Sequence, residues 1–220
     1  NVEGIRALLP GLEAAAVVRR APTLLTLAPA RLEHNVEQLR RMFPDAGMAT
    51  VVAGRAPQLL YSDPSSLDRR LAALQELFPG ADAAAMALKA PTLLSVTSET
   101  IERNLAAIER LEILSGVGAK DVVASQPALL NRSPEGLTLK AESLANLCER
   151  SPAWSRQLRG YGASTLALLL TFSQKRHARL EQLATLPSKA RDAYPVSLVI
   201  TCTEDRFKGI LDDQYARKAD

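Results

Sequence analysis

A short apolar motif recurs four times along the chain and divides it into stretches of similar length. Each copy contains a proline, one variable residue and a pair of leucines, and the copies lie at residues 21–25, 56–60, 90–94 and 126–130. The steps from one proline to the next are 35, 34 and 36 residues. Similarity at such a period indicates an array of structural repeats.

Each copy is predicted to separate two helices. Proline has no amide hydrogen and clashes with the carbonyl group four residues earlier, so it ends or kinks the helix before it. The leucine pair is then expected to pack between neighbouring helices. The apolar runs predicted to form the first helices lie at residues 14–18, 50–53, 83–88 and 121–124.

An amphipathic second helix is predicted after each copy, because apolar residues recur there at intervals of three and four positions. Leu71, Leu105 and Leu144 are expected to be buried on these helices. Asp63 and Ser98 stand where an N-terminal cap is expected. The predicted spans are about 29–43, 62–78, 98–115 and 133–150.

A fifth unit is expected to be less regular. Leu169 and Leu170 match the leucine pair, but Ala167 stands where the proline would be, and terminal repeats are commonly atypical. Its second helix is predicted over residues 174–186. We therefore predict an all-α solenoid of about five two-helix units, which lie near residues 1–44, 45–79, 80–115, 116–151 and 152–191. Residues 192–220 are predicted to form a C-terminal capping segment of the same domain.

The composition agrees with a helical core. Of the 220 residues, 47% are apolar but only 4% are aromatic, which suits closely packed helices of Leu, Ala and Val better than a β-sandwich or barrel. No apolar run approaches the roughly 18–20 residues that a membrane span needs. Cys148 and Cys202 are expected to be buried thiols in a reducing compartment and not a disulfide.

The proline, the leucine pair and the Ser or Thr turn after them resemble the repeat of the mitochondrial transcription termination factor (mTERF) family. The Trp, Gly and Tyr positions of tetratricopeptide repeats and the Thr-Pro-Leu-His turn of ankyrin repeats are absent. Pro195, Leu198, Glu204 and Arg206 also fall at the offsets of the family's C-terminal signature. The chain departs from that signature at Thr203, Phe207, Gly209 and Ile210.

This resemblance implies a curved half-ring superhelix that binds nucleic acid on its basic concave side. Proteins of this kind act in organelles, in transcription termination, in ribosome assembly or structure, and in RNA processing. The resemblance therefore implies the mitochondrial matrix, with the chloroplast as the alternative. The chain begins at Asn1 and not at methionine, as would follow if a targeting segment had been removed.

Enzymatic chemistry is not expected. His34 and His177 lie far apart in the repeat order, and the sequence has no Ser/His/Asp set, Cys-x-x-Cys spacing or glycine-rich phosphate loop after a strand. Asp212 and Asp213 form an acidic pair that we interpret as solvated helix surface, and Trp154 is interpreted as a packing anchor. We predict no metal, no cofactor and no small-molecule substrate.

Positive charge is concentrated towards the C-terminal end. The net charge is only +3, yet residues 151–191 carry seven Lys or Arg against Glu181 alone, whereas residues 1–150 carry 16 against 17. A local excess of this kind is typical of a surface that binds a polyanion, and the alternative is a solvated basic face. The nucleic-acid-binding candidates in this region and in the C-terminal signature are Arg156, Arg159, Lys175, Arg176, His177, Arg179, Lys189, Arg191, Arg206 and Lys208.

A row of cations also recurs with the motif. Arg20, Arg55 and Lys89 stand two residues before the first three motif prolines, and Ser125 takes that position in the fourth copy. Equivalent positions in a solenoid lie along one face. This row is therefore predicted to follow a phosphate backbone.

A second row stands nine residues after the second leucine of the motif. It contains His34, Arg69, Arg103 and, in the fifth unit, Arg179, whereas the fourth repeat has Leu139. The alternative to phosphate binding is neutralisation within each repeat by the adjoining carboxylates of Glu33, Asp68 and Glu102.

We therefore predict a non-catalytic nucleic-acid-binding protein of an organelle. RNA, and specifically ribosomal RNA, is favoured over duplex DNA, because five units are few for a full turn of duplex and the basic charge lies at one end. Ribosomal proteins would be further partners. Two alternatives remain open, a DNA-binding transcription termination factor and a protein–protein scaffold.

Overall fold

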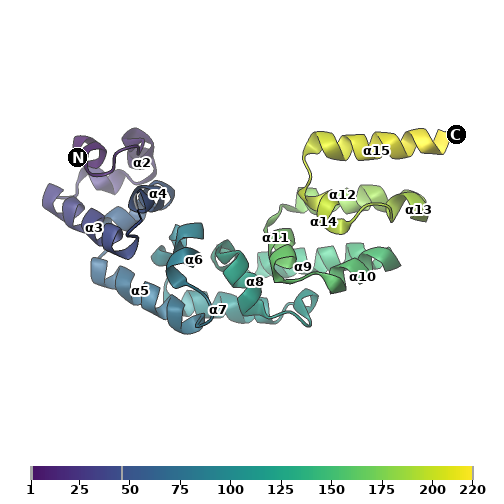
Figure 1. Cartoon of the computed structure of the whole chain (residues 1–220), viewed down its shortest axis with the longest axis horizontal. Helices are drawn as coiled ribbons and strands as arrows, with labels where there is room; N and C mark the ends of the chain where they lie inside the picture. The colour runs from purple at the N-terminus through teal and green to yellow at the C-terminus, as the bar shows by residue number, and fades with distance from the viewer. Residues whose placement is uncertain (1, 46, 220) are drawn as a thin grey trace. The chain divides into compact units, whose positions relative to one another are not determined.

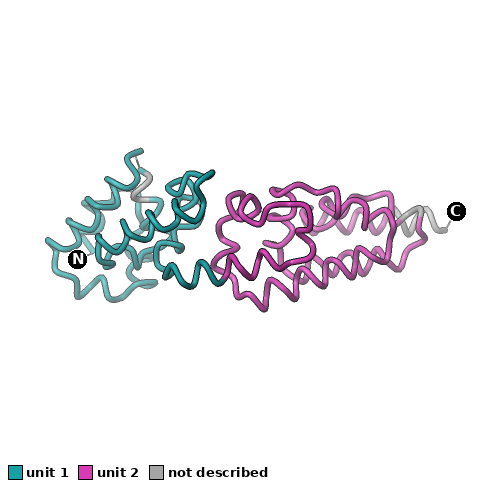
Figure 2. The backbone as a smooth tube through the Cα atoms, turned by 90° about the horizontal axis from the view of Figure 1, so that it is seen from below, with its two compact units in different colours: residues 1–103 teal, residues 104–220 magenta. Residues whose placement is uncertain are grey.

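The protein is all-helical over the part of the chain that the structure describes. The computed structural model covers residues 2–45 and 47–219, with the side chains of residues 48–50, 189–190 and 214–219 outside the description, and no strand occurs among these residues. The expectation of an all-helical fold is confirmed for these residues. The chain divides into two compact units, residues 1–103 and 104–220 (Figure 2).

The first unit repeats the order α-helix, short 3-10 helix, α-helix (Figure 1). It begins with α1 (Val2–Leu8), and α7 (Ser98–Glu109) carries the chain into the second unit. The elements between them are α2 (Ala14–Arg20), η1 (Pro22–Leu25), α3 (Pro29–Met42), α4 (Met48–Arg55), η2 (Pro57–Tyr61), α5 (Pro64–Leu77), α6 (Ala83–Lys89) and η3 (Pro91–Ser95).

The second unit continues this order and adds elements to it. One more set of α-helix, 3-10 helix and α-helix is followed by pairs of α-helices alone. The elements are η4 (Glu112–Leu114), α8 (Ala119–Ser125), η5 (Pro127–Asn131), α9 (Pro134–Glu149), α10 (Pro152–Gly160), α11 (Ala163–Thr171), α12 (Gln174–Ala184), α13 (Ser188–Arg191), α14 (Val196–Thr201) and α15 (Glu204–Ala219).

The four motif prolines end the first helices, as predicted. Each proline is the first residue of a 3-10 helix, and the residue before it has left the α region, with φ −134° and ψ 70° at Ala56 and φ −137° and ψ 74° at Ala90. Proline imposes this on its predecessor through a clash with its ring. In the fifth repeat, Ala167 replaces the proline and does not force the preceding residue out of the α region. Helix α11 therefore continues through the leucine pair to Thr171.

The leucine pairs are buried in three of the four motif copies. In the first copy only Leu24 is buried, whereas Leu25 is 53% exposed and Pro22 lies at the surface. The expectation that both leucines pack between helices is therefore wrong for Leu25.

The second helices begin where their caps predict. The Asp63 carboxylate accepts a 2.9 Å hydrogen bond from the amide of Ser66. Helix α7, the second helix of the third repeat, is capped by Thr97 and not by Ser98, because the Thr97 hydroxyl accepts a hydrogen bond from the amide of Thr100 at 3.4 Å. That helix ends at Glu109, earlier than expected, and the chain continues through η4.

The predicted core is largely correct. Leu105 and Leu144 are buried, whereas Leu71 is only half-buried. Trp154 is fully buried, which agrees with the role of a packing anchor. The thiols of Cys148 and Cys202 are buried and free.

A recurring hydrogen bond ties each second helix to the leucine pair of the following repeat. Its donor lies ten residues after the second leucine, and its acceptor is the carbonyl oxygen of the second leucine in the next copy. The bonds run from Asn35 to Leu60 at 2.8 Å, from Arg70 to Leu94 at 2.5 Å, from Asn104 to Leu130 at 2.7 Å and from Lys140 to Leu170 at 3.4 Å. Each bond lies within one unit.

Candidate nucleic-acid interface

The cations that precede the motif prolines are exposed at the ends of the first helices. Arg20 ends α2, Arg55 ends α4 and Lys89 ends α6. All three side chains reach solvent. In the fourth copy the hydroxyl of Ser125 lies 3.1 Å from that of Ser164 on α11.

This row also has a structural role. Arg20 donates hydrogen bonds to the carbonyl oxygens of Gly54 and Arg55, at 2.6 and 2.7 Å, and Arg55 donates to the carbonyl oxygen of Leu88 at 2.9 Å. Cations stabilise helix C-termini because the last carbonyl groups carry partial negative charge. Each arginine thus caps the first helix of the following repeat. A guanidinium has five N–H donors, so an exposed arginine bound in this way retains donors for phosphate.

The layer of first helices in the first unit carries an excess of positive charge. Arg19, Arg20, Arg55 and Lys89 lie in helices α2, α4 and α6, whose own residues include no Asp or Glu. Glu13, directly before α2, pairs with Arg19 at 3.9 Å, and Asp82 caps the start of α6. The second helices α3 and α5 instead mix five Lys or Arg with four Asp or Glu. Within this unit, α2, α4 and α6 follow one side and α5 the other (Figure 1). The two layers of the unit therefore differ in charge.

The second predicted row lies on the second helices. His34, Arg69 and Arg103 are exposed, and Arg69 donates a 3.3 Å bond to the carbonyl oxygen of Ser65 in its own helix. No ion pair joins these side chains to the adjoining carboxylates within the described residues. Side chains at successive positions of a helix point in different directions, which accounts for this.

The structure corrects the prediction for His177 and Arg179. The His177 side chain is fully buried, and its Nε2 lies 2.9 Å from the carbonyl oxygen of Leu169. Arg179 is 4% exposed, donates to the Cys202 carbonyl oxygen at 2.8 Å and pairs with Glu204 at 2.8 Å. Neither side chain is available to a phosphate at the surface.

Arg176 is likewise committed to internal contacts. Its half-buried guanidinium donates to the carbonyl oxygens of Ile200, Thr201 and Cys202 at 3.0 to 3.2 Å and lies 4.7 Å from the ring centroid of Phe172. With Arg179 it binds α12 to the end of α14. Arg176 therefore has a structural role through Nη1, and its contact with phosphate stays a prediction.

Carboxylates of the C-terminal region offset the basic segment in space. Arg191 is half-buried, forms a 2.7 Å ion pair with Asp192 and lies 5.9 Å from the ring centroid of Trp154. Glu204 likewise forms a 2.8 Å ion pair with Arg179. Two of the seven cations of residues 151–191, Arg179 and Arg191, therefore pair with carboxylates that follow the segment in the chain. The predicted ligand Lys189 lies outside the described side chains.

Five of the predicted cations in the C-terminal region remain exposed. They are Arg156, Arg159, Lys175, Arg206 and Lys208. Two of them lie close to one carboxylate: the hydrogen bond from Arg179 lowers the pKa of Glu204, and the charges of Lys175 and Lys208 lower it further. Lys175 and Lys208 thus come together from α12 and α15, although the carboxylate between them reduces their joint field.

Sequence reasoning missed two cations with a recurring structural role. Arg70 and Lys140 belong to the series of donors to the next repeat's leucine pair, one position after the exposed row. A polar residue at this position in four successive repeats was a usable signal, because one-sided helices seldom place polar residues repeatedly against a core.

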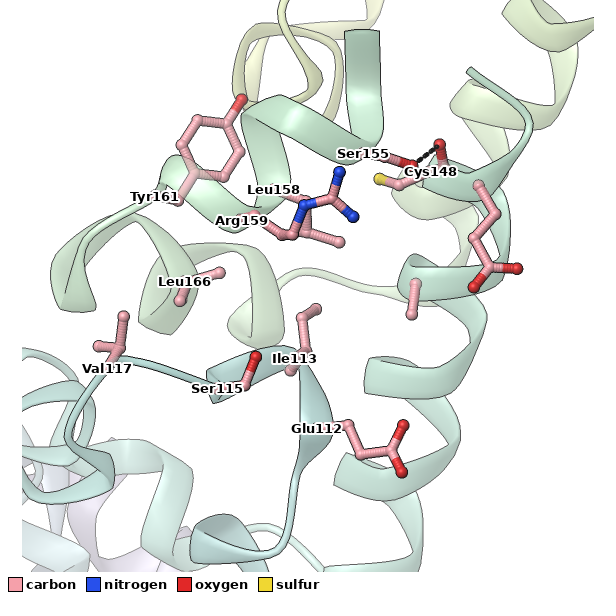
Figure 3. A pocket seen from close by; sticks show the side chains of 12 residues that line it. Glu112, Ile113, Ser115, Val117, Cys148, Ser155, Leu158, Arg159, Tyr161 and Leu166 are labelled. Carbon is pink, nitrogen blue, oxygen red and sulfur yellow. Dashed lines mark hydrogen bonds between the residues drawn. The ribbon is translucent and has the colours of Figure 1, made fainter. Parts of the chain in front are cut away.

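No group of three His, Cys, Asp or Glu side chains suited to a metal ion occurs in the described ranges, and no helix there is long and apolar enough to cross a membrane. Burial raises the pKa of the Cys148 thiol to about 12, so the reactive thiolate is scarce. A cavity of about 480 Å³ in the second unit lies beside this thiol (Figure 3).

Comparison of the sequence with protein-family models gives no match, and comparison with curated proteins gives no relative.

Proposed function

We propose that this protein is a non-catalytic, nucleic-acid-binding helical-repeat protein of the mTERF type. On this proposal, about five repeats form a curved half-ring, and residues 192–220 cap its end. Four proline corners, each opening a 3-10 helix at a step of 34 to 36 residues, support the repeat assignment. The resemblance carries the proposed location in the mitochondrial matrix, with the chloroplast as the alternative.

One observation carries the proposed binding surface. Arg20, Arg55 and Lys89 recur once per repeat, are exposed, and lie on helices whose own residues include no Asp or Glu. Cations that recur at the period of a repeat array can contact successive phosphates, and each such contact adds affinity through the release of counterions. The two arginines are held in place by the helix ends that they cap, which lowers the entropy lost when they bind.

RNA, and ribosomal RNA in particular, is the proposed ligand. Recurrent cations contact a backbone without reading base sequence, and folded RNA is recognised largely through the shape of its backbone. A DNA-binding termination factor is the second candidate, because the same row suits duplex phosphates. A protein–protein scaffold is the third, and it is the candidate that predicts no dependence on phosphate.

The proposal is tested by measuring the fluorescence anisotropy of a labelled folded ribosomal RNA fragment and of a labelled DNA duplex. Three phosphate contacts predict that log Kobs falls with log salt concentration with a slope of about −2 to −3. Tighter binding of the RNA at every salt concentration supports the RNA proposal, and tighter binding of the duplex supports the second candidate. The absence of binding to both overturns the proposed function. Co-sedimentation of the cellular protein with ribosomal particles then tests the proposed partner.

A further inference from the structure

Two connections between helices in the second unit are longer than the equivalent connection in the first. The link from α5 to α6 spans residues 78–82. The link from α7 to α8 spans residues 110–118 and contains η4, and the link from α9 to α11 spans residues 150–162 and contains α10. Insertions in a repeat protein often gather on one face and form its binding surface.

A groove lies between these two insertions and α9. One cavity of about 480 Å³ is lined by the η4 region, α9 and α10 (Figure 3). A second cavity of about 620 Å³ extends along α9. The two cavities share Glu112, Ile113, Ala145 and Glu149, so they adjoin each other along η4 and α9 and are described together as one groove.

The groove is lined by small and apolar side chains. Thr138, Ala141 and Ala145 follow α9 at intervals of three and four residues and therefore form one stripe. Ile113 and Leu158 add larger apolar surface from the two insertions. Small residues let a second helix approach α9 closely, at the roughly 8–10 Å between axes seen in packed helices.

Three carboxylates and two guanidinium groups lie on the rim of the groove. Glu112, Glu142 and Glu149 are exposed, and none of their carboxylates has an ion-pair or hydrogen-bond partner within the described part of the chain. Two cations, Arg110 and Arg159, also line the groove, and the Arg159 guanidinium lies over the cavity in Figure 3. The rim therefore has an excess of negative charge, which favours a basic occupant.

We propose that this groove binds an amphipathic helix of a protein partner, with Lys or Arg on both sides of its apolar stripe. The apolar stripe packs on the partly exposed Ala145 and Ile113, and the cations pair with Glu112, Glu142 and Glu149. Grooves that receive helices commonly work in this way. The inference does not depend on the proposed nucleic-acid surface, which lies on other helices.

The test uses two labelled peptides of about 14 residues, roughly four helical turns, with the same apolar face of Leu and Ala. One carries Lys on the flanks of that face and the other carries Glu. The whole chain is expected to bind the Lys peptide at least ~10-fold more tightly than the Glu peptide, since like charges at an interface are strongly disfavoured. Equal binding of both peptides, or no binding of the Lys peptide, overturns the proposal.

Two variants locate the site. Combined Glu112→Gln, Glu142→Gln and Glu149→Gln is expected to weaken binding of the Lys peptide roughly 5-fold, because exposed ion pairs are individually weak. Ala145→Trp is expected to block the groove sterically. The matched control, Glu33→Gln with Glu76→Gln and Glu181→Gln, removes the same charge from exposed positions elsewhere and is expected to leave binding unchanged.

The outcomes distinguish binding at the groove from attraction by the overall negative charge of the chain. Equal losses in the two triple variants would show that the negative charge of the chain, and not the groove, attracts the peptide, and would overturn the proposal. Retained binding in Ala145→Trp, with thermal unfolding unchanged, would do the same. RNA affinity measured on the groove variants is expected to stay at the wild-type value, so this test and that of the proposed function fail independently.

Discussion

The side-chain amide of Asn104 donates a 2.7 Å hydrogen bond to the carbonyl oxygen of Leu130, and Asn35 makes the equivalent bond to Leu60 at 2.8 Å two repeats earlier. Both asparagines are buried. A buried carbonyl group at the end of a 3-10 turn needs a donor, and these side chains supply it from the preceding second helix. The bond sets the register between successive repeats.

Asn104→Ala is therefore expected to destabilise the second unit by about 1–3 kcal/mol, because it leaves the Leu130 carbonyl group without this donor in the interior. Urea unfolding followed by circular dichroism measures the loss. The control is Arg103→Ala, one position earlier and exposed, which is expected to change stability by less than about 0.5 kcal/mol. Equal effects of the two substitutions would contradict the role assigned to Asn104.

Removing a proline at one corner and adding one at another are both expected to destabilise the protein. Pro91→Ala removes a buried proline that ends α6 and is expected to cost about 1–3 kcal/mol through displaced packing of Leu93 and Leu94. Ala167→Pro would restore the motif of the other repeats, yet it is expected to cost about 3 kcal/mol or more, because α11 is continuous there. Thermal unfolding measures both, and a stabilised Ala167→Pro variant would show that α11 tolerates a corner.

The stability lost when a leucine is truncated to alanine should depend on how deeply its side chain is buried, and not on its place in the sequence pattern. Leu144→Ala is expected to cost about 2–5 kcal/mol, because the residue is fully buried on α9. Leu71→Ala on α5 is expected to cost clearly less, since its side chain is half-buried. Denaturant unfolding of the two variants compares them directly, and a larger loss at Leu71 would be inconsistent with the packing of α5.

Acidification is expected to destabilise the protein through His177. Burial lowers the pKa of this ring, and the nearby charge of Lys140 lowers it further, while the hydrogen bond to the Leu169 carbonyl raises it. The unfolded chain, with a pKa of about 6.5, then binds more protons than the folded one below that pH. The stability contributed by the neutral ring is thus complete above about pH 6.5 and is lost as the pH falls towards the folded pKa.

The measurement is the urea midpoint between about pH 7 and about pH 5.5, a range above the usual carboxylate pKa values. The midpoint of the wild type is expected to fall across this range, and His177→Gln is expected to flatten the dependence. His34→Gln, at an exposed histidine, serves as the control and should leave the slope as it is. A wild-type midpoint that does not change with pH would refute the assignment.

Much of the local structure could be predicted from the sequence. A proline dictates the conformation of its predecessor and the end of its helix, so the corners at Pro57 and Pro91 depended on near neighbours alone. The interior position of Trp154 followed from the large apolar surface of its side chain. The sequence also showed that the fifth repeat has Ala167 in place of the motif proline. It did not show that α11 would continue through this position.

The site was harder to predict because charge acts across space. Arg179 looked unopposed along the chain, yet Glu204, 25 residues later, packs against it once α14 follows α12. Arg176 finds its partners in backbone carbonyl groups, which carry no sequence signal. Arg20 and Arg55 were placed correctly at the surface, but their capping of the next helix depends on how repeats stack, and neighbouring residues do not reveal it.

The last prediction concerns the row of Arg20, Arg55 and Lys89. Replacing all three by Gln removes their charge but keeps an amide donor for the helix ends that the arginines cap, so folding is disturbed less than by Ala. RNA binding is expected to weaken, and the slope of log Kobs against log salt concentration is expected to become shallower by about 2–3, since each lost phosphate contact contributes about 0.7–0.9. Anisotropy titrations over a range of salt concentrations measure both quantities.

The control is a second triple variant, Arg6→Gln with Arg110→Gln and Arg150→Gln, which removes the same charge from exposed residues outside the row. Its salt slope is expected to remain near the wild-type value, because these side chains do not recur at the repeat period. Equal losses in both variants would mean that net charge, and not this row, attracts the RNA. If neither variant loses affinity, the row is structural only, and its exposure and spacing follow from the capping of successive helices alone.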